Sequence, residues 1–130
     1  MAEAREYHTQ QVHYIRKTVN FNDAGISAGV VIGALPKGAQ IIDVVANVVT
    51  AFNAGTTNVL TVGTNASSYD DIAGSGDINE ASATGQRVTT GLGLEFSADT
   101  DVYVMYAQTG AAATAGQAVI VIAYVPNNDG

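Results

Sequence analysis

The chain has 130 residues and a formal net charge of −7, from five basic and twelve acidic side chains. That length fits a single domain, and an apolar share of 47% excludes a disordered chain. The surplus of negative charge would repel a phosphate backbone, which excludes nucleic acid as the partner. Charged residues make up only 13% of the sequence, about half the usual share, so we expect uncharged surface that partner chains can cover.

The N-terminal segment differs in charge from the rest. Residues 1–17 carry Arg5, Arg16 and Lys17 against two glutamates, whereas the remainder is strongly acidic, so we expect the two parts to attract each other. Met1 to His8 lack the apolar core of a signal peptide, so we expect a soluble protein made in the cytoplasm, with no membrane partner. The absence of cysteine excludes disulfides and thiolate metal sites.

The first ten residues are polar and contain no turn residue. They predict an N-terminal arm over residues 1–10, followed by one β-sandwich domain over residues 11–130. Alternating side chains predict a first strand over Gln11–Val19. A second is expected over Ile26–Leu35, where Gly29 or Gly33 would mark a bulge.

The stretch Gln40–Phe52, around which the rest of the chain is expected to be organised, predicts a strand with two unequal faces. One face is fully apolar and the other only partly so, which is typical of a central strand in a sandwich sheet. The first face holds Ile42, Val44, Ala46, Val48 and Phe52, and the second holds Ile41, Asp43, Val45, Asn47 and Val49.

A short strand is expected over Asn58–Gly63, and further strands are expected after it. The polar tract 64–87 predicts an exposed loop, anchored by Tyr69 and Ile72, with a short edge strand near Ser68–Ile72. The last three strands are expected at Gln86–Phe96, Thr100–Gln108 and Gln117–Val125, and both faces of the final one are apolar. About eight strands without a convincing amphipathic helix predict an all-β fold, a two-sheet antiparallel β-sandwich of jelly-roll type.

Few residues suggest chemistry. The acidic loop offers Asp70, Asp71, Asp77 and Glu80 as weak candidate ligands for calcium, but their spacing is not that of an EF-hand and a solvated acidic loop is the preferred interpretation. His8 and His13 would point to opposite faces of one extended segment and could not share a metal. No nucleophile elbow occurs, so we expect no catalytic residues, no cofactor and no enzymatic activity.

Four aromatic residues could form a platform for a sugar ring. They are Tyr69, Phe96, Tyr103 and Tyr106. Tyrosines in alternating strands are more often part of the core, which is the interpretation preferred for this set.

Several runs resemble the head cement or decoration proteins of tailed double-stranded DNA phages. The first is Thr50-Ala51-Phe52-Asn53-Ala54-Gly55-Thr56-Thr57-Asn58-Val59-Leu60-Thr61-Val62-Gly63-Thr64. The others are Asp99-Thr100-Asp101-Val102-Tyr103, Ala113-Thr114-Ala115-Gly116 and Ile122-Ala123-Tyr124-Val125-Pro126. The resemblance is one of general pattern and covers most of the chain after residue 18.

This resemblance implies a jelly-roll protein that binds the outside of the capsid as an oligomer and staples neighbouring major capsid subunits. The expected partners are therefore the major capsid protein and further copies of this chain, as a homodimer or homotrimer. We expect Arg5, Tyr7, His8 and Tyr14, in or next to the arm, to contact the partner. The alternative is a carbohydrate-binding or fibre-tip module that uses the loop over residues 64–87.

Overall fold

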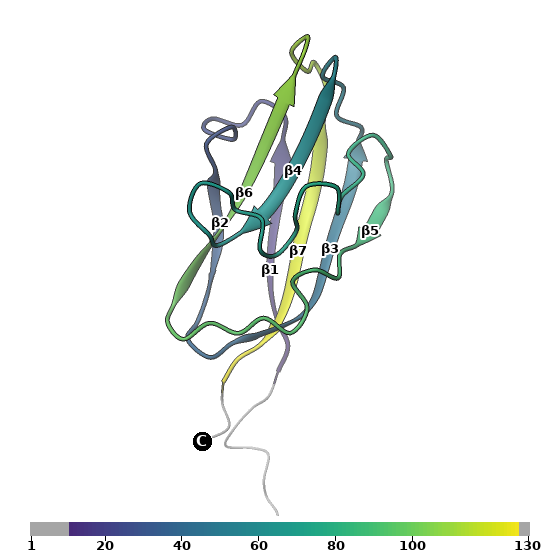
Figure 1. Ribbon diagram of the computed structural model, residues 1–130. Helices are drawn as coiled ribbons and strands as arrows, with labels where there is room; N and C mark the ends of the chain where they lie inside the picture. The colour runs from purple at the N-terminus through teal and green to yellow at the C-terminus, as the bar shows by residue number, and fades with distance from the viewer. Residues whose placement is uncertain (1–10, 128–130) are drawn as a thin grey trace, which may run out of the picture.

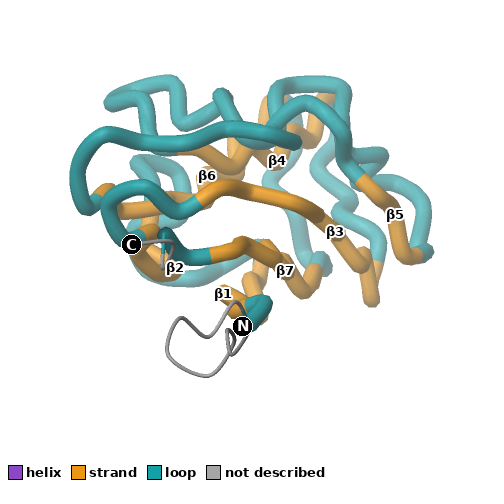
Figure 2. The backbone as a smooth tube through the Cα atoms, turned by 90° about the horizontal axis from the view of Figure 1, so that it is seen from below, coloured by secondary structure: helices purple, strands orange, loops and turns teal. Residues whose placement is uncertain are grey.

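The computed structural model describes residues 11–127, which form two antiparallel sheets packed face to face (Figure 1). The strands are β1 (His13–Asn20), β2 (Val30–Leu35), β3 (Gln40–Thr50), β4 (Thr57–Gly63), β5 (Gly85–Arg87), β6 (Thr100–Thr109) and β7 (Gln117–Val125). One sheet has the order β1-β7-β3-β5 and the other β2-β6-β4, so every connection crosses between the sheets. Figure 2 shows the two layers end-on.

The predicted fold class is confirmed, with seven strands in place of about eight. The chain between residues 11 and 127 forms no helix long and apolar enough to cross a membrane. The final predicted strand, Gln117–Val125, has the predicted bounds, and β1 lies within one or two residues of its prediction. β2 begins at Val30, four residues late, because hydrogen bonds from Ile26 N to Asp23 O and from Ala28 N to Gly25 O form turns ahead of it.

The strand predicted over Gln86–Phe96 is wrong beyond its first residues. Gly85–Arg87 pairs with β3 as the short strand β5, and Glu95 returns to form an isolated bridge with Gln40. The chain between them turns, with hydrogen bonds from Leu92 N to Thr89 O (3.2 Å) and from Leu94 N to Gly91 O (3.3 Å). Gly91 passes so close to the Ile72 backbone that an added Cβ would lie 2.9 Å from it. The segment therefore crosses the end of the sandwich as a turn.

β3 lies between β7 and β5, which confirms its central position. The predicted phase of its first residues is wrong, because Ile41 is 1% exposed whereas Ile42 is 41% exposed. The register against β7 shifts between Ile41 and Asp43, and this bulge turns Ile42 out of the core. From Val44 onward the predicted apolar face is buried, with Ala46, Val48 and Phe52.

The core fills the space between the two sheets. Inward side chains of β7 (Ala118, Ile120 and Ile122) meet those of β4 and β6, and full burial of each large aliphatic side chain contributes about 2 kcal/mol. Gly33 marks a register shift against β6, which confirms the predicted bulge there. The Ile15 side chain packs where a Cβ on Gly33 would lie, at 2.9 Å.

Candidate functional site

The acidic loop uses its aspartates as hydrogen-bond acceptors for its own chain. Asp71 accepts from the backbone N–H (2.7 Å) and hydroxyl (2.6 Å) of Thr64. Asp77 accepts from the Gly74 N–H (2.7 Å) and the Thr90 hydroxyl (2.6 Å), and Asp70 accepts from the Asn65 amide. In the part of the chain that the structure describes, no three His, Asp or Glu side chains gather to hold a metal ion.

Glu80 lies apart from these aspartates and is only 8% exposed. Its Oε2 accepts the backbone N–H of Leu60 at 2.8 Å, and its carbonyl accepts the N–H of Phe52 at 3.0 Å. Burial raises the pKa of the Glu80 carboxyl, against the opposing effect of the Leu60 hydrogen bond. The pKa of Tyr106 is also raised, by burial and then by the negative charge of Glu80. Glu80 therefore ties the loop to β4.

The loop after β4 is packed more tightly than the predicted exposed loop. Ile72, Ala73 and Ile78 are all buried, and Val62 of β4 pairs with Ala73 in an isolated bridge. That bridge takes the place of the edge strand predicted near Ser68–Ile72. This bridge and the hydrogen bond from the Leu60 N–H to the Glu80 carboxylate cover the outer edge of β4.

The same loop covers the outer face of the three-stranded sheet. The ring of Tyr69 stacks on that of Tyr103, with centroids 4.4 Å apart and planes inclined by 21°. Tyr69 lies at a φ of 45°, and its ring occupies the space where a Cβ on Gly29 would lie. Figure 1 shows the loop passing in front of β6 and β4.

The four aromatic residues considered as a sugar platform do not form one surface. Tyr69 and Tyr103 stack on each other, and Tyr106 is buried with its ring centroid 4.8 Å from that of Phe52. Phe96 is partly buried and packs against the core from the turn ahead of β6. The rings therefore belong mainly to the core and to the covered sheet.

The outer face of the four-stranded sheet has no comparable cover, and no loop of the described residues lies across it (Figures 1 and 2). We call it the bare face. The registers place Arg16, Val121, Val45 and Arg87 in one row across it, with Tyr14 and Ala123 in the row beside Asp43. The bare face comprises Tyr14, Arg16, Thr18, Asp43, Val45, Asn47, Arg87, Val119, Val121 and Ala123.

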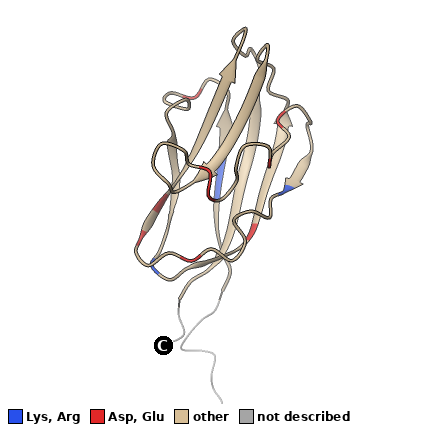
Figure 3. Ribbon diagram, viewed as in Figure 1, with Lys and Arg blue, Asp and Glu red and all other residues tan. Residues whose placement is uncertain are grey.

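The bare face is apolar at its centre and weakly basic at its sides. Val45, Val119 and Val121 are only half-buried, and Tyr14 is 65% exposed. Arg87 Nε lies 2.9 Å from Asp43 Oδ1, while Arg16 stands on the other side of the valines. Figure 3 shows how few basic residues the described chain has and how widely the acidic ones are spread.

Of the predicted partner-contacting residues, Tyr14 lies on the bare face. Arg5, Tyr7 and His8 lie outside the described residues, as does the predicted arm. His13 stacks on Tyr124, with ring centroids 5.7 Å apart. Val45, Val121 and Arg87 were not among the predicted contact residues. The second apolar face of Gln117–Val125 was a signal for Val121, whereas Val45 and Arg87 join it only through the strand registers.

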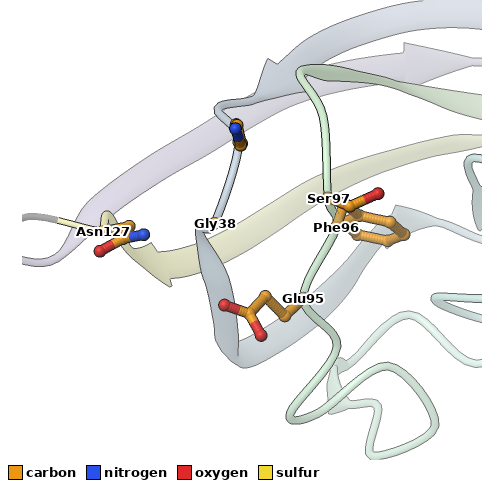
Figure 4. A pocket seen from close by; sticks show the side chains of 6 residues that line it. Gly38, Glu95, Phe96, Ser97 and Asn127 are labelled. Atoms are coloured by element: carbon orange, nitrogen blue, oxygen red, sulfur yellow. The ribbon is translucent and has the colours of Figure 1, made fainter.

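An open pocket of about 350 Å³ lies at the end of the sandwich near residue 127 (Figure 4). It is lined by Lys37, Gly38, Glu95, Phe96, Ser97 and Asn127. The backbone around it is held by hydrogen bonds from Gly38 N to Phe96 O (2.9 Å) and from Lys37 N to Asp99 Oδ1 (2.8 Å). Among the hydrogen bonds of the described residues, none joins the Ser97 hydroxyl to Lys37 or Glu95, the two groups of the lining that could serve as its base.

The fold resembles chains in three solved phage capsid structures. A chain of the cyanophage Pam1 capsid asymmetric unit is 22% identical with a TM-score of 0.66, and the match covers 97% of this chain and 92% of that one. A chain in the acidic stable capsid structure of Helicobacter pylori bacteriophage KHP30 is 19% identical, with a TM-score of 0.61 and coverages of 88% and 86%. A chain in the capsid of Ralstonia phage GP4 is 16% identical, with a TM-score of 0.61 and coverages of 98% and 91%. No protein-family model and no curated protein matches the sequence.

Proposed function

We propose that this chain is a structural virion protein that binds the outer surface of a phage capsid and staples neighbouring major capsid subunits. The observation that carries the proposal is the likeness to capsid chains, which extends over 97% of this chain and 92% of the Pam1 chain. The match covers nearly the whole of both chains, so it supports a common role for the sandwich as a unit. The proposed role is accordingly one of binding, without enzymatic activity.

The proposed contact elements are the arm over residues 1–10, with Arg5, Tyr7 and His8, and the adjoining Tyr14. Tyr14 supports this assignment because its ring is largely exposed on β1, four residues after the arm. An exposed tyrosine offers a large apolar surface with a polar tip, which is common at protein interfaces. Many copies on a symmetric shell would add avidity to a modest single contact.

The test is co-sedimentation with shells assembled from the major capsid protein encoded in the same phage genome. The full chain is expected to sediment with the shells, and deletion of residues 1–10 is expected to weaken binding while circular dichroism shows an intact sandwich. Tyr14→Ala should weaken binding to a smaller extent. A full chain that stays in the supernatant at every shell concentration would overturn the proposal. Unchanged binding of the truncated chain would overturn only the role of the arm.

The carbohydrate-binding alternative gains no support from the structure. Its loop places Tyr69 on Tyr103 within the same chain, so one face of each ring is already covered. A glycan array that shows binding would nevertheless identify such a function directly.

A further inference from the structure

We propose that the bare face binds a second copy of this chain in a head-to-tail contact. The inference rests on the proposed function, because it names the surface through which the stapling protein would self-associate. The occupant is the opposite side of the sandwich in another copy, the outer side of the three-stranded sheet together with the loop that covers it.

The centre of the bare face is apolar, which is the first reason to expect that it is covered. Val45 and Val121 are register partners on two neighbouring central strands, and Val119 lies on the same face two residues before Val121, opposite Asn47. Packing of the core requires apolar side chains only on the inner face of these strands. It does not explain why valines also lie on their outer face. In a soluble monomer the outer face of an antiparallel sheet is usually polar, so half-buried valines at its centre indicate a surface that is covered in the assembly.

The distribution of charge over the molecule indicates which surface could cover the bare face. Residues 11–127 contain four basic side chains, of which Arg16 and Arg87 lie on the bare face. They contain nine acidic side chains, of which only Asp43 lies there, and it is paired with Arg87. The bare face is therefore slightly positive on a molecule whose other surfaces are acidic. A second copy presents those acidic surfaces, which gives charge complementarity between the two sides.

The opposite side of the sandwich has the matching chemistry. On the outer face of the three-stranded sheet, Asp101 of β6 lies opposite Ala34 of β2, and the next outward position pairs Tyr103 with Val31. Asp101 and Asp70 are exposed, and Val31 is 48% exposed. This side therefore combines carboxylates with apolar surface and carries no basic residue on β4 or β6.

Two different sides that fit each other produce a heterologous contact, which closes into a ring or continues as a filament. A self-complementary contact of bare face against bare face would instead bring Arg16 and Arg87 of both copies into one interface. Only one carboxylate per copy would be there to neutralise them. The head-to-tail arrangement is thus the one that the charges favour.

The experiment is light scattering coupled to size exclusion on the full chain and three variants. Wild type is expected at a multiple of the 13.3 kDa chain mass. Val121→Glu, at the centre of the bare face and opposite Arg16, and Asp101→Lys, on the other side, should each run as monomers. Ala112→Glu adds the same charge in the exposed loop between β6 and β7 and should keep the wild-type mass. Circular dichroism and thermal melting check folding, and Arg16→Glu replaces Val121→Glu if that variant does not fold.

Mixing the two monomeric variants distinguishes the contact geometries. Val121→Glu retains an intact acidic side and Asp101→Lys retains an intact bare face, so head-to-tail binding predicts a 1:1 dimer in the mixture. A self-complementary contact of bare faces predicts instead that Asp101→Lys keeps the wild-type mass on its own, and that result would overturn the head-to-tail assignment. A mixture of two monomeric variants that forms no dimer would overturn it as well. Wild type that is monomeric, or Val121→Glu that keeps the wild-type mass, would overturn the inference altogether.

Shell binding separates this inference from the proposed function. An oligomeric wild type that fails to sediment with shells contradicts the proposed function and leaves the self-association surface in place. A monomeric wild type that sediments with shells supports the proposed function and removes the inference.

Discussion

The outer face of the three-stranded sheet is covered by the chain's own loop, with Tyr69 stacked on Tyr103, whereas none of the described residues crosses the outer face of the four-stranded sheet. Both sheets belong to one sandwich and share one core, so the difference does not arise from core packing. The difference between the two outer faces arises from the path of the long connection between β4 and β5. The chain uses that connection to cover one sheet and the edge of β4, and it leaves the valines of the other sheet partly exposed.

Glycine shows the same contrast at two positions. A Cβ on Gly63, on the covered side, would lie 2.5 Å from the backbone of Tyr69 and Asp70. A Cβ on Gly85, on the bare face, would meet nothing closer than the Asn47 Oδ1 at 3.9 Å. Neither residue has a positive φ, so close approach by the loop is what distinguishes Gly63. A tightly apposed loop constrains the sequence beneath it, and a bare sheet does not.

The largest expected effect on stability comes from adding a methyl group at Gly63, compared with the same change at Gly85. Gly63→Ala should destabilise the fold by about 3 kcal/mol, because the loop backbone must move away from β4. Gly85→Ala should change the free energy of unfolding by no more than about 0.5 kcal/mol. Urea denaturation of both variants measures the difference. Equal urea midpoints for Gly63→Ala and Gly85→Ala would contradict the close packing of the loop against β4.

The second prediction detaches the loop from the edge of β4. Glu80→Ala leaves the Leu60 N–H without its acceptor, which should cost about 2 kcal/mol for an unsatisfied buried donor. Glu95→Ala, which removes an exposed carboxylate, is the control and should melt at the wild-type temperature. Comparable losses in the two variants, measured by thermal melting, would rule out a specific role for the buried carboxylate.

A smaller effect is expected from the tyrosines that lie over each sheet. Tyr69→Leu removes the stacked ring pair and should destabilise the protein by about 1 kcal/mol. Tyr14→Leu on the bare face should change stability by less than about 0.5 kcal/mol, since its side chain is largely exposed. Chemical denaturation of the two variants gives the comparison, and reversed sensitivities would contradict the assignment of covered and bare sides.

The smallest effect concerns pH. Burial raises the pKa of Glu80 in the folded protein, so the fold favours the protonated form. The resulting stabilisation is fully present below the carboxyl's unfolded pKa and is lost as the pH rises through the raised folded value. Glu80→Gln keeps an oxygen for Leu60 and cannot ionise, so its advantage over wild type should grow as the pH rises from about 4 to 7. A stability difference that is constant with pH would contradict the raised pKa.

Strong alternation in the sequence was sufficient to predict the long strands. β7 has the predicted bounds and β3 the predicted central place, because both are rich in β-branched residues, which favour strands, and apolar residues on both faces suit a central position in a sheet. Ile42 was assigned to the wrong face because a bulge adds one residue to the strand, and nothing in the local pattern marks it. The segment Gln86–Phe96 failed as a strand because close approach to Ile72, a contact distant in sequence, makes it turn at Gly91.

The candidate surface was less predictable than the fold. The low share of charge indicated surface for partner chains, and both faces of Gln117–Val125 were seen to be apolar. Which valines face outward together depends on the registers of β1, β3 and β7, and those registers depend on the bulges. The pairing of Arg87 with Asp43 joins residues 44 apart, so it could not be found from local spacing.

β1 starts and β7 ends at the same end of the sandwich, with His13 paired to Tyr124. The loop between β6 and β7 therefore lies at the far end, where Asn53 Oδ1 accepts the N–H groups of Thr114 and Ala115. A peptide grafted at the exposed Ala112 would be displayed away from both described ends and away from the bare face. A label inserted directly after β7 would instead stand beside the start of β1, where Tyr14 of the bare face pairs with Ala123. The far loop is thus the site of choice for labelling the protein.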